Sequence, residues 1–169
     1  MKSYLLLLSV VLLSTSCAHK YYIVRHAEKA PASGTGSMTS SDPPLSDKGK
    51  ERAIALRETL KSEKIGYIFS TNTVRTKTTA EPTREYFNLQ TTIYAPQAPD
   101  SFINKLKSLK KNVLVVGHSN TVDDIVNKLC GTAKIPADLD ERVYDNLYIV
   151  RKKGKKMKYE NKKYGAAAH

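Results

Sequence analysis

Three short apolar runs, each followed at once by a polar cluster, constrain the fold of this chain more than any other feature. The runs are KYYIV at residues 20–24, IGYIF at 65–69 and NVLVV at 112–116. Each is rich in β-branched and aromatic residues, as buried strands are. Stretches between and after them carry apolar residues at helical spacing. Strands that alternate with helices favour an α/β fold around a mostly parallel sheet.

The other expected elements continue this alternation within one domain, which is what 169 residues allow. We expect helices at 46–61, 73–86, 101–109 and 121–129, a weak strand at 91–94 and a last strand at 146–150. The basic stretch from Arg151 predicts a solvated edge strand with a frayed tail, or else a contact with an anionic surface. Residues 165–169 (GAAAH) are either the end of this tail or an appended sequence, so the predicted domain covers residues 18–164.

The first seventeen residues predict an export signal. A lysine precedes an apolar run at 5–13, which is too short to span a bilayer but fits the core of a secretory signal peptide. Small residues then lead to Cys17, which resembles a bacterial lipoprotein signal, whose cysteine becomes the lipidated first residue of the mature protein. Cleavage after Ala18 without lipidation is the alternative. Both interpretations place the protein outside the cytoplasm, and lipidation would anchor it to a membrane of the cell envelope.

Charge and composition limit the class of partner. The formal net charge of +12 favours an anionic partner, such as a phosphate group, nucleic acid or an acidic lipid surface. Nucleic acid is disfavoured, because the chain has no Trp and only 3 Phe, so base stacking would depend on Tyr. Cys130 has no basic residue beside it, which predicts a small buried apolar group rather than a nucleophile.

Polar side chains follow all three strands. Arg25 and His26 follow the first, Arg75 lies shortly after the second, and His118 follows the third. The carboxyl ends of strands line the ligand crevice of an open α/β sheet, so neighbouring strands would bring these four side chains together. Two arginines can hold phosphate oxygens bidentately, and a neutral imidazole can attack phosphorus. The pattern predicts a phosphoryl-transfer site, with further N–H donors from the helix start at Asn120.

Four segments together resemble the histidine phosphatase superfamily, in its phosphoglycerate-mutase-like branch. In family order they are RHAE (25–28), LSDKGKERA (45–53), STNTVRTKTTAEP (70–82) and VVGHSN (115–120). The resemblance covers most of residues 20–130. It implies a three-layer α/β/α sandwich.

The resemblance also implies a role for each of the four side chains. His26 would be the nucleophile, Arg25 and Arg75 the phosphate ligands, and His118 the second histidine of the phosphate pocket. It implies neither a metal nor another cofactor. The residues agree with this, because two histidines beside two arginines would repel a divalent cation.

The proton donor is left open by the sequence. The glutamate that the mutases of the family carry after the second arginine motif is missing, and only Asp100 lies in that region. Ser119 stands where the other branch of the family has an aspartate, and Ala27 replaces the usual glycine. Glu28 is the carboxylate nearest in sequence to His26, and a salt bridge to an active-site arginine is its alternative role.

We therefore expect an exported, metal-independent phosphatase that hydrolyses phosphomonoesters through a phosphohistidine at His26. The chain has no insertion large enough for a cap domain, which predicts an open site for a small phosphorylated substrate or a phosphate group on an envelope component. Phosphoglycerate-mutase-type transfer is the enzymatic alternative, and the missing glutamate disfavours it. A non-catalytic phosphate-binding envelope protein is the alternative of another class, and it would have no need of a nucleophile.

Overall fold

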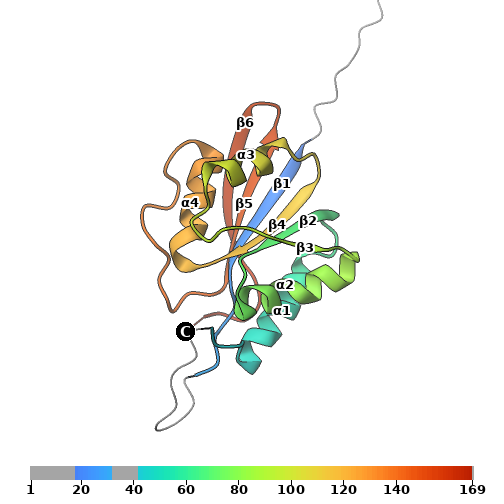
Figure 1. Cartoon of the computed structure of the whole chain (residues 1–169), viewed down its shortest axis with the longest axis vertical. Helices are drawn as coiled ribbons and strands as arrows, with labels where there is room; N and C mark the ends of the chain where they lie inside the picture. The colour runs from blue at the N-terminus through green and yellow to red at the C-terminus, as the bar shows by residue number, and fades with distance from the viewer. Residues whose placement is uncertain (1–17, 32–41, 169) are drawn as a thin grey trace, which may run out of the picture.

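Six strands form one sheet in the computed structural model, which describes residues 18–31 and 42–168 (Figure 1). They are β1 (His19–Arg25), β2 (Ile65–Ser70), β3 (Thr91–Ile93), β4 (Asn112–Gly117), β5 (Asn146–Lys153) and β6 (Lys156–Lys163). Their order across the sheet is β3-β2-β4-β1-β5-β6. The first four are parallel, and β5 and β6 add an antiparallel edge. The predicted mostly parallel sheet is confirmed.

Helices cover both faces of the sheet. On one face lie α1 (Asp47–Leu60) and α2 (Val74–Phe87), and on the other lie α3 (Asp100–Ser108) and α4 (Ser119–Cys130). Successive side chains of a strand point to opposite faces, so each face has its own apolar core. Along β1, Tyr21 and Ile23 pack with α3 and α4, whereas Tyr22 and Val24 pack with α1 and α2. The expected three-layer sandwich is therefore present.

The sheet order places the three strands with polar ends side by side, with β4 between β1 and β2. Arg25 at the end of β1 lies opposite Gly117 at the end of β4. Ser70 at the end of β2 lies opposite Val116. The three carboxyl ends are thus level, and the polar residues that follow them meet at one edge of the sheet.

Capping side chains begin the two helices on the first face. Ser46 Oγ accepts the backbone N–H of Gly49 at the start of α1, and Thr73 Oγ1 does the same for Thr76 at the start of α2. Gly49 is needed for close packing, because a Cβ there would come 2.3 Å from the carbonyl oxygen of Glu28. Helix α1 is thereby held against the segment that follows β1.

Two boundaries differ from the sequence prediction. The basic stretch from Arg151 contains the predicted solvated edge strand, β6, but β6 pairs with β5 from Lys156 to Lys163, where a frayed tail was expected. Helix α4 begins at Ser119, before the predicted start at residue 121. The reason is that His118 is the N-cap, and its backbone N–H donates to Thr121 Oγ1 over 3.0 Å.

The structure describes the C-terminal end of the chain up to residue 168, whereas its description of the N-terminal end starts at residue 18. The predicted signal at 1–17, with Cys17, lies outside the described residues, as do residues 32–41 and residue 169. No helix of the described ranges is long and apolar enough to cross a bilayer. The segment after residue 164, which was left out of the predicted domain, contacts it: Arg52 of α1 donates to the carbonyl oxygen of Ala166 as well as to that of Tyr164.

Candidate active site

The backbone that follows β1 is fixed by two hydrogen bonds. The N–H of His26 donates to the Gly117 carbonyl over 2.9 Å, one residue beyond the end of the strand. The N–H of Ala27 donates to Thr79 Oγ1 of α2, also over 2.9 Å. The centroid of the His26 ring thereby lies 5.5 Å from that of the His118 ring.

His26 has the protonation that a nucleophile needs. Its side chain is buried, and Nδ1 lies 2.8 Å from the carbonyl oxygen of Ala27. A carbonyl can only accept, so Nδ1 carries the ring proton and Nε2 keeps a free lone pair. Burial lowers the pKa of His26 to about 3, and the charges of Arg25 and Arg75 add to this effect. The imidazole is therefore neutral near pH 7.

Arg25 is a buried cation held from several sides. Its guanidinium lies 4.4 Å from the centre of the Tyr144 ring, a cation–π contact, and Nη1 donates to the Asp140 carbonyl over 3.1 Å. Nη2 forms an ion pair with the Glu141 carboxylate. All of these partners come from the segment between α4 and β5. This segment therefore fixes the guanidinium beside His26.

Arg75 comes from the first turn of α2 and reaches the same place. Nη1 forms an ion pair with Asp42 Oδ1 over 3.0 Å. The other oxygen of Asp42 accepts the backbone N–H of Val74 over 2.8 Å. Within the described residues, the buried Nε of Arg75 and that of Arg25 have no hydrogen-bond acceptor. Each arginine thus keeps a donor that a bound anion can use.

His118 links the ends of β2 and β4. Its Nδ1 lies 3.5 Å from Arg75 Nη2, which can only donate, so the ring proton is on Nε2. Nε2 lies 2.8 Å from Thr71 Oγ1. Burial, together with the charges of Arg75 and Arg25, lowers the pKa of His118 to about 4. His118 is a neutral ring in the free protein, and a phosphate dianion beside it would favour its protonated form.

The structure does not bring all the candidate proton donors into this site. Glu28 lies beside it, but both carboxylate oxygens accept from Arg52 Nε, at 3.0 and 2.8 Å, and not from Arg25 or Arg75. Asp100 forms an ion pair with Lys128 over 3.2 Å. Lys128 is in the last turn of α4, at the opposite end of that helix from His118. Asp100 is therefore remote from the site.

Asn120, the predicted backbone and substrate contact, is exposed in the first turn of α4. Its φ of −94° and ψ of 15° depart from helical values. It lies next to the site at the helix start, but no hydrogen bond of its side chain within the described residues links it to the four central side chains.

Sequence reasoning missed four residues that contact the central group: Thr71, Asp42, Glu141 and Tyr144. Glu141 accepts a hydrogen bond from Ser119 Oγ and lies 4.0 Å from Lys29 Nζ, in addition to its pair with Arg25. Thr71 lies within the predicted motif segment at residues 70–82, so its place in that segment could have identified it as a site residue. Asp42, Glu141 and Tyr144 lie in loops without a periodic pattern, and only the folded chain brings them to the site.

A pocket beside the central group gives room for more than a phosphate. It has a volume of about 260 Å³, and its lining includes Glu141 and Tyr144 from the site together with Lys48 and Arg142. Both signs of charge are present on its walls. No group of three or more His, Cys, Asp or Glu side chains suited to a metal ion occurs in the described ranges.

The fold and these side chains define an α/β protein with two arginines and two neutral histidines at the carboxyl edge of its sheet, a set of groups suited to binding a phosphate. Residues 21–95 match the family model of the histidine phosphatase superfamily (branch 1). This match confirms the predicted resemblance to that superfamily, and it includes three of the four motif segments, whereas VVGHSN (115–120) lies outside it. No curated protein matches the chain in sequence.

Solved structures share the fold. The protein histidine phosphatase SixA, in complex with tungstate, is 19% identical with a TM-score of 0.65, and the match covers 85% of this chain and 96% of SixA. A mycobacterial glucosyl-3-phosphoglycerate phosphatase is 12% identical with a TM-score of 0.64, over 89% and 100% of the two chains. Bacillus stearothermophilus YhfR is 17% identical with a TM-score of 0.60, over 83% and 94%. At these identities the likeness concerns the fold.

Proposed function

We propose that the protein is a metal-independent phosphatase that hydrolyses phosphomonoesters through a phosphohistidine at His26. The observation that carries the proposal is a neutral, buried imidazole whose free Nε2 lies among Arg25, Arg75 and His118. A neutral imidazole nitrogen is a competent nucleophile towards phosphorus. The arginines compensate the charge of the phosphoryl oxygens, which would otherwise repel the lone pair.

The first step forms a bond between Nε2 of His26 and phosphorus and breaks the bond from phosphorus to the ester oxygen. Arg25 and Arg75 hold the phosphoryl oxygens, and His118 donates to them once it is protonated. The leaving oxygen takes a proton from a nearby acid. In the second step water attacks phosphorus, the bond from phosphorus to nitrogen breaks, and the acid, now ionised, takes the proton of the water. Inorganic phosphate and free His26 result.

Glu141 is the acid that the geometry supports best. It reaches the site from a loop, forms an ion pair with Arg25, and is exposed enough to meet a leaving group. Burial raises the pKa of Glu141, but the Ser119 hydroxyl and the charges of Arg25 and Lys29 outweigh it and keep the pKa low in the free protein. A phosphate dianion that takes over Arg25 removes this stabilisation, so Glu141 would become protonated when substrate binds.

Trapping the phosphoenzyme tests the proposal. Rapid quenching with labelled substrate, in EDTA, should yield a phosphoenzyme that is labile in acid and stable in base. His26→Ala should abolish both the label and turnover. Equal turnover in this variant would exclude the mechanism, and loss of turnover in EDTA that added metal restores would exclude metal independence.

A phosphoryl group displayed on a protein is a second candidate substrate. The match to SixA, which is named as a protein histidine phosphatase, covers 85% of this chain and 96% of SixA, and this likeness of fold supports the second candidate. Comparing kcat/KM for a phosphohistidine-containing protein with that for small phosphomonoesters separates the two substrate classes.

We also propose that the protein is exported and anchored through a lipidated Cys17. The support is the sequence of residues 1–17, with its apolar run and its small residues before the cysteine. Cys17→Ser should release the protein from the membrane fraction and leave phosphatase activity unchanged. The intact mass of the membrane-extracted protein distinguishes lipidation at Cys17 from simple secretion, because simple secretion would give an unmodified mass beginning at His19.

A further inference from the structure

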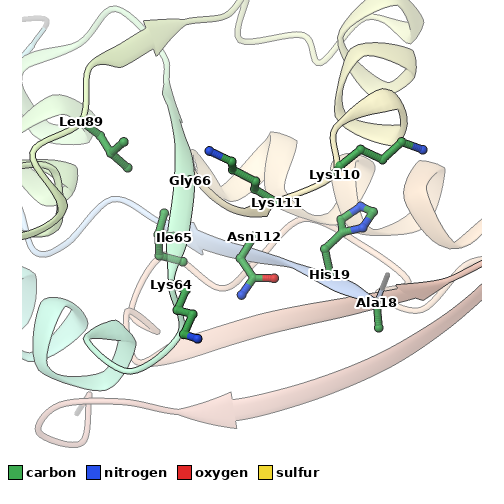
Figure 2. A pocket seen from close by; sticks show the side chains of 9 residues that line it. All are labelled: Ala18, His19, Lys64, Ile65, Gly66, Leu89, Lys110, Lys111 and Asn112. Carbon is green, nitrogen blue, oxygen red and sulfur yellow. The ribbon is translucent and has the colours of Figure 1, made fainter. Parts of the chain in front are cut away.

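The amino ends of β1, β2 and β4 surround a hollow at the end of the sheet opposite the active site (Figure 2). It has a volume of about 470 Å³. Lys64 comes from the turn before β2, and Lys110 and Lys111 come from the turn before β4. The stem of Lys111 lies across Gly66, where a Cβ would come 2.5 Å from Lys111 Cδ. The stem is thus packed while the ammonium group stays in solvent.

A second hollow of about 440 Å³ lies at the same end, beside the turn between β5 and β6. Its lining includes Lys107, Lys152 and Lys155. The two hollows are neighbours, because Lys152 pairs with His19 across β5 and β1, and His19 lines the first hollow. We call the six lysines of the two hollows the lysine end: Lys64, Lys107, Lys110, Lys111, Lys152 and Lys155.

The lysine end has an uncompensated positive charge. Neither hollow is lined by an aspartate or glutamate. Within the part of the chain that the structure describes, none of the six lysines forms an ion pair with a carboxylate. Glu63 lies next to Lys64, but it pairs with Lys20 over 2.7 Å. Burial lowers the pKa of Lys152, and the charges of Lys110 and Lys107 lower it further, as expected for crowded cations.

The chain direction ties this end to the N-terminus. Ala18 lines the first hollow and is followed directly by β1, so the preceding residue, Cys17, joins the chain at the lysine end. The active site lies at the other end of β1, a strand of seven residues. At about 3.3 Å per residue the two ends are roughly 23 Å apart.

We infer that the lysine end is a docking surface for an anionic phospholipid bilayer, which holds the active site facing away from the membrane. Charge complementarity and the exit of the chain beside the first hollow carry this inference. Two shallow hollows lined by ammonium groups fit lipid phosphates, which lie side by side at a bilayer surface. A single acyl chain binds a membrane only marginally, and a basic surface beside it makes the attachment stable.

Vesicle binding by the full chain with Cys17→Ser, which cannot be lipidated there, tests the surface by itself. Binding is measured to vesicles of phosphatidylcholine and to vesicles that also contain phosphatidylglycerol. We expect tighter binding to the anionic vesicles, weakened by salt. Each lysine near an anionic surface contributes about fivefold in affinity, so Lys64→Gln, Lys110→Gln and Lys111→Gln together should weaken anionic binding roughly a hundredfold. Binding to neutral vesicles, to which residues 5–13 contribute equally in both proteins, should not change.

The matched control removes the same charge near the other end of the molecule, with Lys48→Gln, Lys50→Gln and Lys77→Gln in the first turns of α1 and α2. It should keep anionic binding within a few-fold of the parent. An equal loss in both triple variants, or no loss in the first, would overturn the proposal. So would tighter binding of short duplex DNA than of anionic vesicles. The first triple variant should keep its phosphatase activity, so this test stands or fails independently of the proposed function.

Discussion

The carboxylates that face the two arginines mark the positions that a substrate phosphate would occupy in the proposed mechanism. Glu141 pairs with Arg25, and Asp42 pairs with Arg75, so each guanidinium faces an oxyanion already in the free protein. Carboxylate and phosphate oxygens are equivalent acceptors for an arginine fork. In the proposed mechanism, substrate binding would therefore exchange these pairs for phosphate contacts.

Removing either arginine tests, at the scale of one side chain, whether that arginine holds the substrate phosphate. Arg25→Ala or Arg75→Ala should lower kcat/KM by about a hundredfold or more, because each removes a donor that stabilises the phosphoryl oxygens in a site shielded from water. Lysine should restore activity only in part, since it is a point charge without a planar fork. Arg84→Ala is the control, because Arg84 pairs with Glu81 on the same helix, away from the site. Unaltered activity in a folded Arg25 or Arg75 variant would remove that arginine from the mechanism.

The role of Glu141 predicts a dependence on the leaving group. Glu141→Gln should lower kcat for an alkyl phosphate roughly a hundredfold, the usual contribution of a general acid. It should affect p-nitrophenyl phosphate much less, because nitrophenolate leaves without a proton. The same two substrates are compared in Asp42→Asn, because Asp42 is the carboxylate that pairs with the other arginine of the site. If both substrates slow equally in Glu141→Gln, Glu141 positions Arg25 and does not donate the proton.

The sequence located the central side chains because each follows a strand. Arg25, His26 and His118 adjoin the ends of runs that are apolar enough to identify as strands. Because the carboxyl ends of strands line one edge of an open α/β sheet, this is sufficient to predict that the three side chains meet. Glu28 is nearest to His26 in sequence, but both of its oxygens accept hydrogen bonds from Arg52 of α1, which the local sequence around Glu28 does not indicate. Nothing in the local pattern around Glu141 indicates that its loop folds back onto Arg25.

At the scale of elements, the prediction was accurate where a residue pattern has a direct physical cause. The buried strands and the amphipathic helices were identified to within a few residues, since their apolar periodicity reflects the two cores. The end of strand β6 was not separated from the predicted frayed tail, because four of its eight residues are lysine and its edge position leaves most of its residues in solvent. Its pairing with β5 depends on the turn at Gly154, which has a φ of 60°.

The contact between α1 and the backbone after β1 makes a prediction about Gly49. Gly49→Ala places a Cβ against the Glu28 carbonyl, and either α1 or the segment after β1 must move. Overpacking of this kind costs about 1–3 kcal/mol, so the free energy of unfolding in urea should fall by that amount. Activity should fall too, because the same segment carries His26. Lys50→Ala, the exposed next residue of the helix, should change neither quantity. A Gly49→Ala protein as stable as the wild type would show that the contact can relax without cost.

At the scale of the whole molecule, the two ends of the sheet have different charge environments. The lysine end lacks carboxylates around its hollows, whereas the arginines of the active site are each paired with one. The active site therefore combines two permanently charged arginines with titratable carboxylates and histidines. Its histidines are neutral in the folded protein because burial and the arginines disfavour a further cation.

This neutrality makes the stability of the protein depend on pH. The pKa of His26 is about 3 in the folded protein, against roughly 6.5 for an unperturbed histidine. Below pH 6.5 the unfolded chain therefore binds a proton that the folded chain does not, and stability is lost as the pH falls towards 3. Each such histidine contributes a slope of up to about 1.4 kcal/mol per pH unit. Urea unfolding of His26→Asn between pH 6.5 and 4 should show a slope smaller by about this amount, because asparagine does not titrate. Since all carboxylates titrate alike in both proteins, an unchanged slope would mean that His26 is charged in the folded state, and the neutral nucleophile would have to be abandoned.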